Sequence, residues 1–133
     1  RPQYQYLDQN KEAEERIYEG ETPGVSYGDI AERYYTVGQY MKEVKDVSKA
    51  MAAAGDSYIC DEYLNAMGSP EAESVYVLHD LNNDGIEEFF IGLKFNYDIP
   101  YYVIYDVYTW KDGRAYQLMR GIGMARVRYV KME

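Results

Sequence analysis

The chain has 133 residues, of which 47% are hydrophobic and 16% aromatic, so its length and composition favour one folded domain and exclude a disordered chain. Its formal net charge is −9 at pH 7, which argues against nucleic acid as a partner. No apolar run approaches the ~20 residues that a transmembrane segment needs, and the single cysteine excludes an intrachain disulfide.

The N-terminal region is predicted to hold one short helix. Residues 11–20 combine strong helix formers with a closing glycine, and the sequence Glu-Thr-Pro-Gly at 21–24 ends the helix. The chain opens at Arg1 without a methionine, so we expect a mature or trimmed form from which a leader has been removed.

A long amphipathic helix is predicted from about Asp29 to Ala54. Asp29 is expected to cap its N-terminus, Gly38 to be a weak point, and Gly55 to end it. The apolar residues that recur at intervals of three and four are Ile30, Tyr34, Val37, Met41, Val44, Val47 and Met51. This periodicity is typical of a helix laid on a core.

A further short helix is predicted to begin at Asp56 or Ser57 and to run through Met67, where Gly-Ser-Pro ends it. Cys60 falls in its apolar part, so a buried, inert thiol is favoured over a reactive one. The methionines of this region are expected to fill the core.

The character of the sequence changes after Pro70, where β-prone runs replace the helical pattern. The predicted strands are Ser74–His79, Ile86–Phe95, Tyr101–Trp110, Ala115–Arg120 and Ile122–Val130. Residues 96–100 and the Asp-Gly of residues 111–114 are expected to form turns.

Strand alternation predicts which side chains share a face of this sheet. In the second strand Phe89, Ile91, Leu93 and Phe95 share one face. In the third, Val103, Tyr105 and Val107 are expected to oppose Ile104, Asp106 and Tyr108.

The predicted fold class is α+β, with N-terminal helices packed on a C-terminal antiparallel β-meander of about five strands. We expect one domain over residues 1–133, with a helical part at about 11–68 and a sheet part at about 74–130.

The most specific pattern lies between the first two predicted strands and has the spacing Asp-x-Asn-x-Asp-Gly-x-x-Glu. Asp80, Asn82, Asp84 and Glu88 occupy positions 1, 3, 5 and 9, and Gly85 occupies position 6. This is the front half of an EF-hand-type calcium loop, in which oxygens at alternate positions converge on one cation. The sequence therefore predicts one structural Ca2+ ion.

Two features separate this loop from a complete EF-hand. Position 12 is Ile91, where a bidentate glutamate belongs, and the flanks are strands rather than helices. The remaining pattern resembles the strand–loop–strand calcium loops of FG-GAP (integrin-α-like) repeats, whose acidic residue falls at position 9. After the turn at Gly85, Ile86 is expected to offer its carbonyl, and Glu88 can close the shell directly or through a water. The alternative is an Asp-Asn-Gly-rich turn that holds no ion.

A wider resemblance covers residues 75–120, about a third of the chain. The runs YVLHDLNNDGIEEFFIG and YYVIYDVYTWKDGR are similar to uncharacterised secreted proteins and lipoproteins of Gram-positive gut bacteria. Asn82, and Phe89 where leucine is usual, are mild departures. The resemblance implies a secreted or cell-surface location and a metal in the 80–88 loop, and it implies no activity.

The remaining candidate residues point to binding rather than to catalysis. His79 is the only histidine and lacks the other members of a nucleophilic set, so a packed or solvated side chain is favoured. Aromatic side chains on a sheet face can stack on sugar rings or anchor a protein partner. The set that could do so is Tyr97, Tyr101, Tyr102, Tyr105, Tyr108 and Trp110. The alternative for this set is packing against the helices.

The sequence thus favours a secreted or surface-anchored, non-enzymatic domain that recognises a protein or a glycan. One alternative is a hydrolase acting on cell-wall or dietary glycan, which needs two carboxylates converging in a cleft. The other is a structural module of a larger surface protein.

Overall fold

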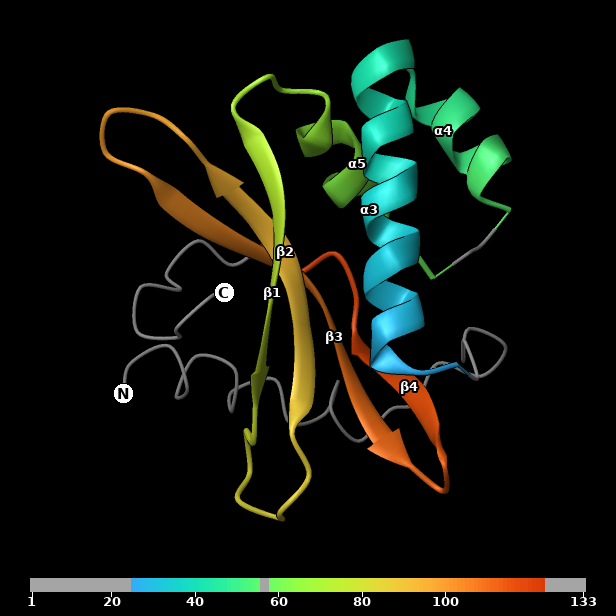
Figure 1. Cartoon of the computed structure of the whole chain (residues 1–133), viewed down its shortest axis with the longest axis vertical. Helices are drawn as coiled ribbons and strands as arrows, with labels where there is room; N and C mark the ends of the chain where they lie inside the picture. Colours follow the sequence, from blue (N-terminus) through green and yellow to red (C-terminus); the bar gives the residue numbers. More distant parts are fainter. Residues whose placement is uncertain (1–24, 56–57, 124–133) are drawn as a thin grey trace.

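A computed structural model describes residues 25–55 and 58–123, and these form the predicted α+β arrangement. The three helices are α3 (Tyr27–Val44), α4 (Val47–Ala54) and α5 (Asp61–Met67). The four strands that follow are β1 (Ala72–His79), β2 (Glu88–Phe95), β3 (Tyr101–Lys111) and β4 (Arg114–Met119). They form one antiparallel sheet in the order β1-β2-β3-β4, with α3 laid along one face (Figure 1). The helix predicted at 11–20 lies outside the described residues.

The prediction of one helix from Asp29 to Ala54 is wrong, because the chain breaks between α3 and α4. Lys45 takes left-handed backbone angles (φ 51°, ψ 41°), and the side chain of Asp46 then caps α4 by accepting from the backbone N–H of Lys49 at 3.1 Å. At the start of α3 the cap is Ser26 rather than Asp29.

Two further helix predictions have different outcomes. The stop at Gly55 is confirmed, since its left-handed φ of 64° ends α4. The helix predicted from Asp56 or Ser57 is shorter than expected, because residues 58–60 are not helical and α5 begins only at Asp61; Asp56 and Ser57 themselves lie outside the described residues. The cap of α5 is Cys60, whose Sγ accepts from the N–H of Tyr63 at 3.4 Å.

Gly38, expected to weaken α3, instead lets α5 come close. A Cβ atom at this position would lie 3.0 Å from the hydroxyl of Tyr63 and 3.1 Å from Cγ of Met67. The missing side chain is therefore a packing requirement between α3 and α5.

The first four predicted strands are confirmed, with ends shifted by one or two residues. The hairpin at 111–114 is also confirmed, since Asp112 and Gly113 have φ angles of 53° and 76°. The sheet has four strands in the described residues rather than about five. Ile122, where a fifth was expected to begin, is not in a strand, and residues 124–130 lie outside the described part.

An irregularity in β3 changes which of its side chains share a face. Its register with β2 runs from Ile91↔Asp106 to Gly92↔Ile104 and skips Tyr105. Tyr105 and Tyr108 therefore pack in the core under the helices, while Val107 joins Ile104 on the opposite face. The predicted alternation is correct before this point of β3 and wrong after it.

The sheet is apolar on both faces. Toward the helices, Phe89, Ile91, Leu93 and Phe95 of β2 pack with helix residues such as Ile30, which confirms the predicted face. The opposite face carries a separate buried cluster, formed by Val77, Leu81, Phe90, Ile104, Val107, Leu118 and Met119.

Candidate metal centre

The loop between β1 and β2 is organised by the carboxylate of Asp80. Its oxygens accept from the backbone N–H groups of Asp84 at 3.2 Å and Gly85 at 2.8 Å. Gly85 has a φ of 87°, which lets the chain turn back toward β2. The carboxylate of Asp84 accepts from the N–H of Ile86 at 2.9 Å. These bonds curl the loop so that positions 1 and 5 of the motif face the same side.

The amide of Asn82 lies between these two carboxylates. With its nitrogen turned inward it donates to Asp84 at 3.0 and 3.2 Å and to Asp80 at 3.3 Å. With its oxygen turned inward, the same geometry brings the amide oxygen next to carboxylate oxygens. Such crowding is favourable only when a cation lies between the oxygens. The side chain of Asn82 thus suits a metal-free and a metal-bound loop equally.

Glu88, the acidic residue at position 9, points inward. It is 1% exposed, and its two oxygens accept from the N–H of Leu81 and from Oγ1 of Thr109, both at 2.9 Å. Burial raises its pKa, the two hydrogen bonds oppose that rise, and the charges of Asp84 and Asp80 add to it. Glu88 therefore ties the loop to β3.

The backbone of the loop favours negative charge at Asp80. Desolvation acts to raise the pKa of this carboxyl, but hydrogen bonds from the N–H groups of Gly85, Asp84 and Asn83 outweigh it and hold the pKa below its ordinary value. The loop is thus arranged around an ionised carboxylate, which is the form that binds a hard cation.

The donor set fits calcium in part. Asp80, Asn82 and Asp84 converge, and Ile86 follows at the position whose carbonyl the motif uses. Among the residues that the structure describes, no three carboxylate, imidazole or thiol groups meet at one point. The converging set is two carboxylates and one amide. Because both oxygens of Glu88 are engaged, water would fill the remaining positions around an ion.

The aromatic residues predicted as one contact surface are divided among several places. Tyr105 and Tyr108 are 8% and 0% exposed and belong to the core, so they are not part of a surface. Tyr102 is half-buried against the cluster on the opposite face. Trp110 packs edge-on to Tyr27, with 5.8 Å between ring centroids.

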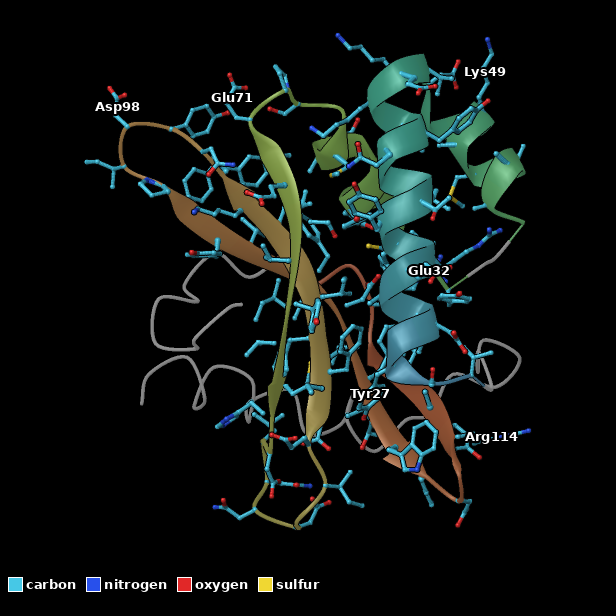
Figure 2. All side chains as sticks on the ribbon, viewed as in Figure 1. Tyr27, Glu32, Lys49, Glu71, Asp98 and Arg114 are labelled. Carbon is cyan, nitrogen blue, oxygen red and sulfur yellow. The ribbon has the colours of Figure 1, made fainter. Side chains whose placement is uncertain are left out.

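Among these six residues, only Tyr97 and Tyr101 stack on each other as an exposed pair. They stack on each other and on Phe95, with centroids 5.0–6.3 Å apart, and they are 49% and 44% exposed. An open hollow beside them is lined by Glu71, Asn96, Tyr97, Asp98 and Ile99. Figure 2 shows Glu71 and Asp98 at this end of the sheet, with Tyr27 near the other end.

The sequence did not reveal a buried polar network centred on Asp106. This side chain is 0% exposed; it accepts from the hydroxyl of Tyr34 and, at 2.9 Å, from the N–H of Gly121. The hydroxyl of Tyr108 bonds to that of Tyr34, and Gln117 donates to Tyr108 at 3.1 Å. Burial raises the pKa of Asp106 to about 6, although these hydrogen bonds oppose the rise. The one indication in the sequence was that Asp106 is a charged residue within an otherwise apolar predicted strand.

The remaining two candidates are Cys60 and His79. Cys60 is 1% exposed, which confirms the prediction of a buried cysteine, and burial raises the pKa of its thiol. His79 is half-buried at the end of β1, next to Asp80.

No described helix is long and apolar enough to cross a membrane. Comparisons with known protein families, with curated proteins and with solved structures found no match for this chain.

Proposed function

We propose that this chain is a recognition domain of a secreted or cell-surface protein, stabilised by one calcium ion in the 80–88 loop. The observation that carries the proposal is the curl of the loop, which brings the carboxylates of Asp80 and Asp84 to one place, each within 3.3 Å of the amide of Asn82. The motif resemblance and the low pKa of Asp80 support the same assignment. The proposed location rests on the resemblance of the loop and its flanking strands to secreted proteins and lipoproteins.

The role proposed for the ion is structural. The loop joins two strands that pair over their full lengths, and the side chains of Leu81 and Glu88 at its base are buried. An ion held by a loop of this kind stabilises a connection that the sheet already defines. Extracellular calcium modules bind at ~10⁻⁴–10⁻³ M, and calcium at about ten times its Kd adds roughly 1.4 kcal/mol to the free energy of unfolding.

The proposed contact surface for a protein or glycan ligand is the β2–β3 hairpin. Tyr97 and Tyr101 present stacked rings there, and Ile99 at the tip is 85% exposed. Glu71 and Asp98 supply hydrogen-bonding groups beside the rings. Rigid aromatic rings with polar neighbours are suited to a sugar ring and to an apolar side chain of a protein.

The hydrolase alternative gains no support from the buried carboxylates of the described region. Glu88 and Asp106 are each engaged by two hydrogen bonds from neighbouring groups. They lie in separate surroundings, since Glu88 supports the loop and Asp106 joins the helices to β3.

Thermal unfolding in EGTA and in millimolar calcium tests the metal assignment. We expect calcium to raise the Tm of the wild type by about 5 °C, as 1–1.5 kcal/mol does for a domain of this size. Asp84→Asn removes one charge but keeps an oxygen that can accept from Ile86, so the variant should fold and lose most of this rise.

The matched control is Asp98→Asn, which removes one exposed charge from the β2–β3 hairpin and should keep the full rise. If calcium raised the Tm of Asp84→Asn as much as that of the wild type, or did not raise the Tm of the wild type, the loop would not be a calcium site.

A further inference from the structure

The outer edge of β1 is open in the described part of the chain. β1 pairs with β2 along its full length, and no described strand pairs with its other side (Figure 1). Natural edge strands are usually protected by charged side chains, above all lysine, by proline or by a bulge. The sequence of β1, AESVYVLH, has one acidic residue, Glu73, but no lysine and no proline, and its pairing with β2 has no register shift. Among the described residues, little therefore protects this edge from pairing with another strand.

Two large side chains of this strand are exposed on the helix side of the sheet. Tyr76 is 45% and Leu78 43% exposed. They lie on the face that carries Phe89, whose ring centroid is 5.4 Å from that of Tyr76. A strand added at the edge would cover both side chains, so the unpaired backbone and the exposed apolar groups form one continuous surface.

We propose that this surface binds a second copy of the chain, by antiparallel pairing of β1 with β1 around a two-fold axis. Such an interface needs a self-complementary strand, because residue i faces residue j and residue j faces residue i. Side chains directly opposite must also share a face, which places the axis at a residue rather than between two residues. Counting the strands of the described residues, the dimer then has one continuous sheet of eight, four from each copy.

The side chains of β1 select the register centred on Tyr76. There Tyr76 meets its own copy, Leu78 meets Ser74, and Glu73 meets His79, so an acidic group faces an imidazole on both sides of the axis. Shifting the centre to Val75 keeps the same overlap but sets Glu73 against Val77, which is 7% exposed. A charge against a buried apolar side chain is unfavourable.

Sedimentation velocity over a range of concentrations tests the dimer. We expect the mass of the wild type to approach twice the 15.5 kDa of one chain, with a Kd in the micromolar range common for small interfaces. Leu78→Lys adds a charge at an exposed position twice per interface and should weaken dimerisation at least tenfold. The control is Tyr35→Lys, at an exposed position of α3, which should leave it unchanged.

Disulfide trapping tests the register. Oxidation should join two copies of Tyr76→Cys, because residues directly opposite in an antiparallel pair lie within disulfide reach. Leu78→Cys should not cross-link, since its two copies would be four residues apart along the strand, roughly 13 Å. The native thiol of Cys60 is buried and should not compete.

A wild type that stays monomeric at all concentrations overturns the proposal. So does a dimer that persists in Leu78→Lys, or one in which Tyr76→Cys fails to cross-link. Circular dichroism of each variant separates loss of the interface from loss of the fold.

Discussion

Asp106 is the residue whose surroundings differ most from those of an ordinary strand position. It lies on β3 and receives hydrogen bonds from Tyr34 of α3 and from Gly121 after β4. Cys60, before α5, and Tyr108 are further titratable groups beside it. One carboxyl thus connects the helices, the sheet and the chain segment that leaves the sheet.

This arrangement predicts a pH dependence of stability. The folded-state pKa of Asp106, about 6, lies above the ordinary 3.8, so the fold prefers the protonated form. Its stabilising contribution is complete below pH 3.8, declines as the pH rises toward 6, and is lost above that value. Because the two pKa values differ by about two units, the free energy of unfolding should fall by roughly 3 kcal/mol over this range.

Asp106→Asn should remove this dependence, because an amide is neutral at every pH and its oxygen can still accept from Gly121. Urea unfolding at pH 4 and pH 7 measures the effect. We expect the free energy of unfolding of the variant, measured relative to that of the wild type, to be 2–3 kcal/mol higher at pH 7 than at pH 4. A constant difference at both pH values would show that the fold does not raise the pKa of Asp106.

The sequence predicted some residue roles and not others, for a physical reason. The candidate ligands of the 80–88 loop are close in sequence, so their spacing alone predicts that they converge. The partners of Asp106 are Tyr34 and Gly121, which are 72 and 15 residues away. Nothing local to Val-Ile-Tyr-Asp-Val-Tyr indicates them. The irregularity at Tyr105 that sets the faces of β3 is likewise a product of strand pairing.

At the scale of elements, the break between α3 and α4 shows a limit of periodicity. The apolar spacing continues from Val44 to Val47, so the pattern alone favours one helix. The structure turns at Lys45, and Asp46 begins a new helix by capping it. The signal was present in the sequence, since aspartate is among the preferred N-cap residues, but it stands inside a run without glycine or proline.

Removing this cap should cost a measurable part of the stability. Asp46→Ala deletes the oxygen that accepts from the N–H of Lys49, so we expect a loss of about 1 kcal/mol and a Tm lower by about 4 °C. The control is Ser48→Ala, an exposed position within α4, which should stay within about 0.5 kcal/mol of the wild type. Equal effects of the two variants would contradict the capping role.

The helix ends and strands that were predicted correctly carry strong local signals. Gly55, the Asp-Gly of the 111–114 turn and the alternating apolar residues of β2 each fix a backbone angle or a buried face by themselves. The start of α5 at Asp61 depends instead on Cys60, which is rarely a cap.

At the scale of the whole molecule, the proposed metal loop and the proposed contact surface lie at opposite ends of β2. The loop precedes Glu88, where β2 begins, and the exposed rings of Tyr97 and Tyr101 follow Phe95, where it ends (Figure 1). The buried core lies between them. Calcium is therefore expected to stabilise the sheet without altering the hairpin that carries the rings.

This separation makes a residue-resolved calcium titration the most direct test of the central claim, that the 80–88 loop holds one calcium ion. In ¹⁵N–¹H NMR spectra, the amides of Asp84, Gly85 and Ile86 should shift with a single saturating curve as calcium is added. The amides of Tyr97 and Tyr101 should stay in place. Unmoved loop amides at about ten times the upper Kd expected for such a module would contradict the account. Shifts confined to other acidic parts of the surface would contradict it equally.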